Sequence, residues 1–172
     1  MGLNRRQLAK WSVLPQLLAH QIAWWTCVLA QGWVGPGVML VFIGVHLWVM
    51  RSHWRTELAL VVLSTGLGIG LDNALAQMGD VQYQGTVLVG LAPLWLVAIW
   101  SGFGATVRHC QSAFFRNRWA ALLTGVVGGP LAYWGGERLG VLTVSGLIGW
   151  IDIGVLWAAA MLTLEGATRR MP

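Results

Sequence analysis

Long apolar runs separated by short polar segments dominate the pattern of the chain. Six runs can be delimited, at residues 12–32, 35–50, 57–78, 86–107, 119–136 and 140–164. A helix that crosses a bilayer needs roughly 20 predominantly apolar residues, with a range of about 17–25. The runs therefore predict an all-α fold, a polytopic transmembrane bundle of six helices, built as one integral membrane domain over residues 1–172.

The composition favours lipid as the solvent of this bundle. Hydrophobic residues make up 56% of the 172 residues, charged residues only 10%, and the mean hydropathy is +0.65. A soluble domain carries about 25% charged residues. The net charge of +5 does not indicate nucleic acid, because the basic residues recur in small groups between the apolar runs and no nucleic-acid-binding motif accompanies them.

The basic residues predict the orientation of the helices. If the N-terminus lies in the cytoplasm and the chain crosses six times, the outer segments hold only Arg138. The inner segments hold Arg5, Arg6, Lys10, Arg51, Arg55, Arg108, Arg116, Arg118, Arg169 and Arg170. Short cytoplasmic loops are enriched in Lys and Arg, and Trp is enriched at the membrane–water interface. Both termini are therefore expected in the cytoplasm, with interfacial indoles at Trp11, Trp33, Trp54, Trp119 and Trp134.

A glycine-rich stretch, "GVVGGPLAYWGGERLG", closes the fifth run and leads to the sixth. Gly125 and Gly129 are four residues apart, so they form a small face that lets another helix approach closely. Pro130 removes a backbone donor and is expected to bend the helix. Three residues near the outer surface are candidates for ligand binding: Tyr133, Glu137 and Arg138.

Together with "GIGLDNALAQMG" and "LAPLWLVAIWSGFGATVRHC", this stretch resembles a bacterial inner-membrane family catalogued as domain of unknown function 2878. The resemblance covers nearly the whole chain. It rests on a short basic N-terminus, a Leu-Asp pair late in the third helix, a Pro-Leu-Trp start of the fourth and a Gly-Gly-Pro-Leu-x-Tyr sequence in the fifth. It implies a small multi-pass membrane protein and no established activity.

Polar residues inside the runs are the remaining candidates for a site. Ionisable groups within a membrane are costly, which makes them functional candidates by default. They are His20, Asp72 and Asp152, to which the neighbouring Asn73 and Gln77 are added. The stripe formed by Gly66, Gly70, Asn73 and Gln77 is expected to face the bundle interior. At about 1.5 Å per residue, Asp152 is expected roughly 18 Å from the outer end of its helix, near the midplane. Each polar residue also has a structural interpretation, as a hydrogen-bond partner of another helix.

These features predict a protein that binds or moves a lipidic or small hydrophobic molecule within the bundle. The alternatives are a membrane-embedded lipid-modifying enzyme and an accessory subunit of a membrane complex. No dense cluster of His, Asp and Glu is visible, which favours a protein that is not an enzyme. No cofactor or metal is predicted, although His20, His46 and His109 leave haem or metal binding open. The expected partners are membrane lipids and a second copy or membrane protein that packs on the small-residue faces.

Overall fold

The computed structural model describes residues 13–90 and 92–171, so the predictions for Arg5, Arg6, Lys10 and Trp11 lie outside the described residues. The described chain is helical over most of its length, and the all-α prediction is confirmed. Its helical segments are α2 (Val13–Ala30), α3 (Val34–Val49), η1 (Arg51–His53), α4 (Trp54–Met78), α5 (Leu94–Thr106), η2 (Ser112–Phe115), α6 (Arg118–Leu123), η3 (Thr124–Gly128), α7 (Gly129–Arg138) and α8 (Gly146–Arg170).

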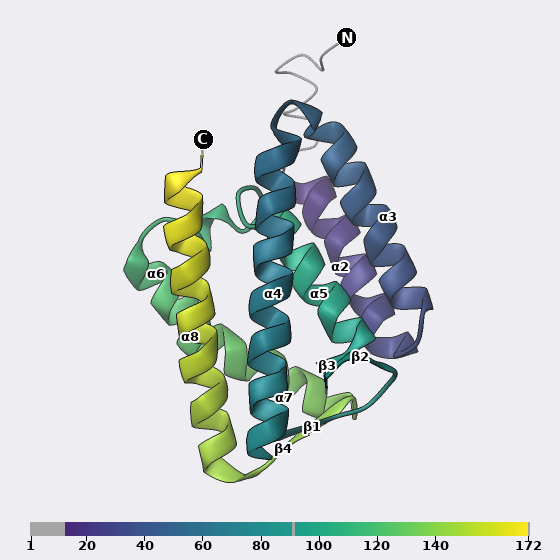
Figure 1. Ribbon diagram of the computed structural model, residues 1–172, viewed down its shortest axis with the longest axis vertical. Coiled ribbons are helices and arrows are strands. Elements are labelled where there is room, and N and C mark those ends of the chain that lie inside the picture. The colour runs from purple at the N-terminus through teal and green to yellow at the C-terminus, as the bar shows by residue number, and fades with distance from the viewer. Residues whose placement is uncertain (1–12, 91, 172) are drawn as a thin grey trace.

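The helices run along the long axis of the molecule, and its two ends differ in character (Figure 1). One end carries the α3–α4 and α5–α6 connections and the end of α8; the other carries the short strands. Among the described residues, the first end holds Arg51, Arg55, Arg108, Arg116, Arg118, Arg169 and Arg170, and the second holds Arg138. We call these the basic end and the strand end.

Two small antiparallel ladders at the strand end correct the predicted starts of the fourth and sixth helices. Strand β1 (Val81–Tyr83) pairs with β4 (Leu142–Val144), and β2 (Val87–Val89) pairs with β3 (Ala92–Pro93). The helices therefore begin at Leu94 and Gly146 instead of 86 and 140. Extended backbone at Pro93 and positive φ at Gly140 and Gly146 account for the later starts, since none of these conformations continues a helix.

The fifth helix is α6, η3 and α7 in sequence, and its glycine face is the one predicted to allow a close approach. A Cβ on Gly125 would overlap the backbone of Ala158 in α8, and a Cβ on Gly129 would overlap Trp157. A π-helical turn, η3, lies immediately before α7 and close to Pro130. Pro130 leaves the carbonyl four residues earlier without its usual donor, and a π turn is one way to relieve that.

The inward face of α4 differs from the predicted stripe. Ser64, Gly68 and Asp72 are buried, whereas Gly66, Gly70 and Gln77 are exposed. The reason is the Trp100 side chain of α5, which occupies the space where a Cβ of Gly68 would lie. The large indole needs the glycine opposite it, and this contact sets which face of α4 turns inward.

Two helical segments of the described chain, Arg51–Met78 and Gly146–Arg170, are long and apolar enough to cross a membrane. The segments Val34–Val49 and Leu94–Thr106 are shorter apolar helices. Many large apolar side chains nevertheless point outward from all around the bundle, including Ile22, Leu40, Trp119 and Ile148, each more than 60% exposed. Soluble monomers rarely expose contiguous apolar patches of more than a few hundred Å², which is consistent with association with a membrane.

Candidate functional site

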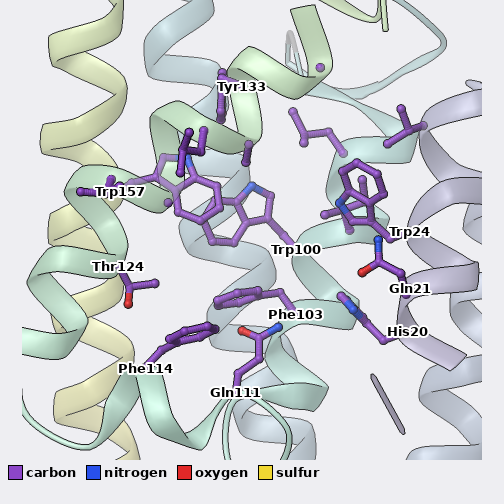
Figure 2. Close-up of a pocket in the computed structure, with 18 of the residues that line it drawn as sticks. His20, Gln21, Trp24, Trp100, Phe103, Gln111, Phe114, Thr124, Tyr133 and Trp157 are labelled. Carbon is purple, nitrogen blue, oxygen red and sulfur yellow. The ribbon is translucent and has the colours of Figure 1, made fainter. Parts of the chain in front are cut away.

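A large apolar pocket of about 810 Å³ lies between two halves of the bundle. Helix α2 packs on α3 and α5, and the α6–η3–α7 helix packs on α8, which leaves space between the two groups. Aromatic rings line much of the pocket: Trp24, Trp95, Trp100, Phe103, Phe114, Tyr133 and Trp157 (Figure 2). Gly128, Ala132 and Gly136 line the opposite wall. Their small side chains leave room that larger residues on the same helix face would fill.

The rim of the pocket lies on the side of the bundle. Leu17 of α2 and Leu123, Val127 and Leu131 of the facing helix line it and are 40–62% exposed. The pocket is therefore reached across an apolar lateral surface, between α2 and the α6–η3–α7 helix.

Two buried polar side chains face the part of the pocket nearer the basic end. His20 of α2 is 6% exposed and Gln111, in the turn before η2, is 9% exposed. Neither the Nε2 atom of His20 nor the Oε1 atom of Gln111 has a hydrogen-bond partner among the described residues. Buried polar groups are normally paired, so these two atoms offer hydrogen bonds to a molecule in the pocket (Figure 2).

Next to the other end of the pocket, a buried carboxylate accepts hydrogen bonds from three side chains, two of which, Trp100 and Tyr133, line the pocket. One Asp72 oxygen accepts hydrogen bonds from the hydroxyls of Tyr83 (2.9 Å) and Tyr133, and the other accepts from Trp100 Nε1 (2.9 Å). Burial, together with Tyr133 and Asp72, raises the pKa of Tyr83, so its phenol remains a donor. The predicted site residues Asp72 and Tyr133 are thus brought together, and their bonds favour the structural interpretation of Asp72.

The structure separates the remaining predicted site residues from the pocket. Asp152 is the seventh residue of α8, because residues 140–145 are not helical. It lies about 9 Å from the start of the helix, so the predicted distance of roughly 18 Å is wrong. It lies beside Asp80, whose pKa is raised by burial and, to a smaller extent, by the neighbouring Asp152 carboxyl. Glu137 accepts a bond from the Val144 backbone, and Arg138 lies over the Trp134 ring.

Asn73 and Gln77 also lie away from the pocket. The Asn73 amide donates to the Ile69 carbonyl and contacts Gly90, and Gln77 is exposed. The glycine at position 90 has φ +61° and leaves space that any Cβ would take from the Asn73 side chain. Asn73 therefore helps to seat Gly90, just past the end of β2, on α4.

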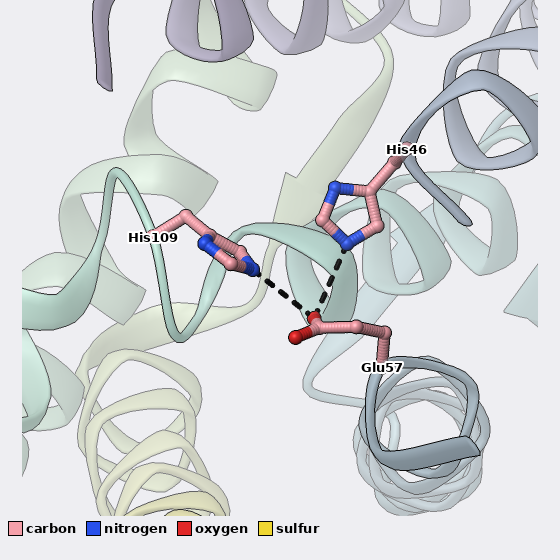
Figure 3. Close-up of side chains that lie close together, drawn as sticks. All are labelled: His46, Glu57 and His109. Carbon is pink, nitrogen blue, oxygen red and sulfur yellow. Dashed lines mark hydrogen bonds and ion pairs between the residues drawn. The ribbon is translucent and has the colours of Figure 1, made fainter. Parts of the chain in front are cut away.

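A second polar cluster lies at the basic end, and sequence reasoning missed its central residue. Glu57, in the first turn of α4, is 2% exposed, and two imidazole rings contact its carboxylate. The Nε2 atoms of His46 and His109 each lie 3.2 Å from Glu57 Oε2, and Arg108 Nη1 lies 4.0 Å from Oε1 (Figure 3). Of the three histidines considered for haem or metal, this cluster unites His46 and His109, while His20 faces the pocket.

The residues missed by sequence reasoning share one feature, which is that long-range contacts define them. Glu57 and His46 are separated by a connection and meet only because α3 and α4 turn back on each other. The one local signal was Glu57 itself, an acidic residue at the beginning of an apolar run. Gln111, Phe114 and Thr124 carry no sequence pattern that would mark them as pocket residues.

The fold and the pocket define an α-helical bundle protein with an apolar interior cavity. The chain belongs to the family described as protein of unknown function (DUF2878), whose profile matches residues 13–163. The resemblance in the sequence is thereby confirmed. Neither the curated proteins nor the solved structures compared with the chain gave a match.

Proposed function

We propose that this protein crosses the bacterial inner membrane six times, with both termini in the cytoplasm, and binds or moves a lipidic or small hydrophobic molecule in its pocket. The pocket itself carries the proposal. Its volume of about 810 Å³ lies within the range of about 300–1,000 Å³ typical of small-molecule sites. Its walls are mostly apolar, and its polar atoms are few.

The position of the rim supports a ligand that arrives from the bilayer. A pocket for a water-soluble molecule would be expected to open at an end of the bundle. This one opens between exposed leucines and valines on the lateral face, the face that lipid chains would contact. The unpaired atoms of His20 and Gln111 in the described structure favour an amphipathic ligand, with a polar group near the basic end and an apolar tail toward Tyr133.

The orientation proposal rests on the two ends of the bundle. Seven of the described arginines lie at the basic end and one at the strand end, which matches the bias of cytoplasmic loops. Trp33, Trp54, Trp119 and Trp134 lie near helix ends and are 46–74% exposed. Indoles in such positions suit the headgroup region.

Native mass spectrometry of protein released from mild detergent, with extraction of bound lipids, tests the binding proposal. We expect one class of amphipathic molecule to accompany the chain at about one copy. Ala132→Phe should displace it, because Ala132 lines the pocket. Ala159→Phe is the matched control, since Ala159 is exposed on α8 and does not line the pocket. Equal retention by both variants, or no bound molecule in the unmodified protein, contradicts the proposal.

The same experiment separates binding from the alternative of a lipid-modifying enzyme. An enzyme needs an acid or base that faces the substrate, and His20 is such a group in the pocket. A His20→Gln variant that still binds the molecule, in cells whose lipid profile is that of the parent, supports a binding or transport protein. Accumulation of an unmodified lipid in His20→Gln cells supports the enzyme.

A further inference from the structure

Three potential ligand side chains converge at the basic end from three separate segments. His46 belongs to the last turn of α3, Glu57 to the first turn of α4 and His109 to the turn after α5. One ligand atom from each lies within 4.8 Å of the others. We propose that His46, Glu57 and His109 bind a divalent transition metal ion, with zinc as the best match.

Two of the three separations between ligand atoms fit a small tetrahedral ion, and the third, between the two imidazoles, lies within 4.8 Å. Zinc binds His nitrogen at about 2.0–2.1 Å and carboxylate oxygen at about 2.0–2.2 Å, which places neighbouring ligand atoms roughly 3.4 Å apart. Both His–Glu separations here are 3.2 Å. Two imidazoles and one carboxylate form a ligand set that holds zinc with a fourth position left for water.

The burial of the cluster favours retention of a bound ion, because little of the site is open to solvent. The side chains of His46 and Glu57 are 0% and 3% exposed, and that of His109 is 23% exposed. The His109 side therefore gives access to the ion and to a water ligand. Arg108 lies on the same side, 27% exposed and 4.0 Å from the second Glu57 oxygen, so it can turn outward when a cation enters.

Gln16 of α2 supplies the outer contact that orients His46. Its Nε2 atom lies 3.0 Å from His46 Nδ1 and donates to the Ala105 carbonyl at 3.0 Å. In this arrangement Nδ1 accepts and Nε2 carries the proton toward Glu57. A metal on Nε2 moves the proton to Nδ1, so the Gln16 amide must turn over, give up its bond to the Ala105 carbonyl and accept with Oε1. That oxygen has no hydrogen-bond partner among the described residues, and it becomes paired in the metal-bound state.

Such outer contacts tune metal affinity by 10–100-fold. Gln16→Leu should therefore weaken zinc binding by about 10-fold or more while the three ligands remain. The ion itself ties α3, α4 and the α5–α6 connection together, which gives it a structural effect that does not depend on what the apolar pocket binds.

The experiment measures zinc and stability on the intact protein in detergent. Purification without chelator, followed by elemental analysis, should give about one zinc ion per chain. Removal with a chelator should lower the midpoint of thermal unfolding, and added Zn²⁺ should restore it. Cobalt in place of zinc should give the visible absorption of a tetrahedral site.

Variants locate the ion. His109→Ala should abolish stoichiometric zinc, and it is the informative variant because His109 is partly exposed and lies in a connection between helices. His53→Ala is the control, since His53 is an exposed histidine outside the cluster, with its Nδ1 atom 3.0 Å from the Ser52 hydroxyl. The proposal is overturned if chelator changes neither the zinc content nor the unfolding midpoint. It is also overturned if His109→Ala and His53→Ala hold equal zinc. In either case the three side chains form only a hydrogen-bonded ion cluster.

Discussion

Tyr133 donates a hydrogen bond to the carboxylate of Asp72, and this contact joins two residues that are 61 positions apart. It connects α7 to α4 across the strand end of the pocket. Tyr83 of β1 reaches the same oxygen, so the first ladder is fixed to the bundle through the same carboxylate. One buried carboxylate thus fixes the relative positions of α7, α4 and β1.

The first prediction is that Asp72 and Tyr133 are energetically coupled. Tyr133→Phe should lower the free energy of unfolding by about 1 kcal/mol, the net value of a typical hydrogen bond. Asp72→Leu should cost more, about 3 kcal/mol or above, since it removes the acceptor of three donors, of which those of Trp100 and Tyr133 are buried. Thermal or denaturant unfolding in detergent, followed by circular dichroism, measures both.

A double-mutant cycle provides the control for this prediction. In the Asp72→Leu background, Tyr133→Phe should be neutral or stabilising, because the hydroxyl no longer has the carboxylate to bind. If Tyr133→Phe costs the same in both backgrounds, the bond between the two residues contributes nothing measurable.

The second prediction concerns the contact between the fifth helix and α8. Gly125→Ala should reduce the yield of folded protein and its unfolding midpoint, because the added Cβ would overlap the Ala158 backbone, which cannot move aside as a side chain can. Gly135→Ala in the same helix is the matched control. A Cβ there meets no atom of the described chain within 4 Å, so alanine should be neutral or stabilise by up to about 1 kcal/mol through helix propensity. Equal tolerance of the two changes would show that α8 can move away from Gly125.

Several of these relationships were accessible from sequence and others were not. The six helices could be placed because each apolar run is long, and the family resemblance rests on motifs spread over most of the chain. The Gly125–Gly129 face was also predictable, since small residues four apart need no knowledge of the partner helix. The identity of that partner, α8, could not be predicted. Sequence periodicity shows which face of a helix packs closely, but it does not show which other helix packs against that face.

The errors have specific physical causes. Strands of two or three residues are too short to show an alternating pattern, so β2 and β4 were counted as the beginnings of helices. That error placed Asp152 too deep. The predicted inner stripe of α4 followed small and polar residues, whereas the actual inner face contains Gly68, which faces Trp100. The polar site at the basic end is formed by side chains from three separate segments, and a single sequence does not show that these segments lie close together.

The third prediction concerns orientation in the membrane. In a background with Cys27 and Cys110 replaced by Ala, Gln84→Cys should react with a membrane-impermeant maleimide added to cells with a permeable outer membrane. Ser52→Cys should react only after the inner membrane is opened. Both positions are exposed, at the strand end and the basic end respectively, so burial does not explain a difference. Labelling of Ser52→Cys alone in closed cells would reverse the orientation, and labelling of neither or both would contradict the six crossings.

The last prediction concerns the carboxyl pair at the strand end. Burial raises the pKa of Asp80, and the neighbouring Asp152 adds to the effect. Asp80 is 8% exposed, and one of its oxygens has no hydrogen-bond partner among the described residues. An acid whose pKa is higher in the folded state binds more protons there than in the unfolded chain, so stability falls as pH rises. The contribution of Asp80 should be fully present below the unfolded value of about 3.9 and should be lost as pH rises through the folded pKa.

The unfolding midpoint, measured from pH 4 to pH 7.5, should therefore decline more steeply for the unmodified protein than for Asp80→Asn, which has no proton to lose. Asp152→Asn should flatten the decline only in part, because burial is the larger cause of the shift and remains when the neighbouring charge is removed. Glu137→Gln is the control, since Glu137 also lies at the strand end but belongs to a different contact, with the Val144 backbone. If Asp80→Asn and the unmodified protein lose stability in parallel over this range, folding does not raise the pKa of Asp80.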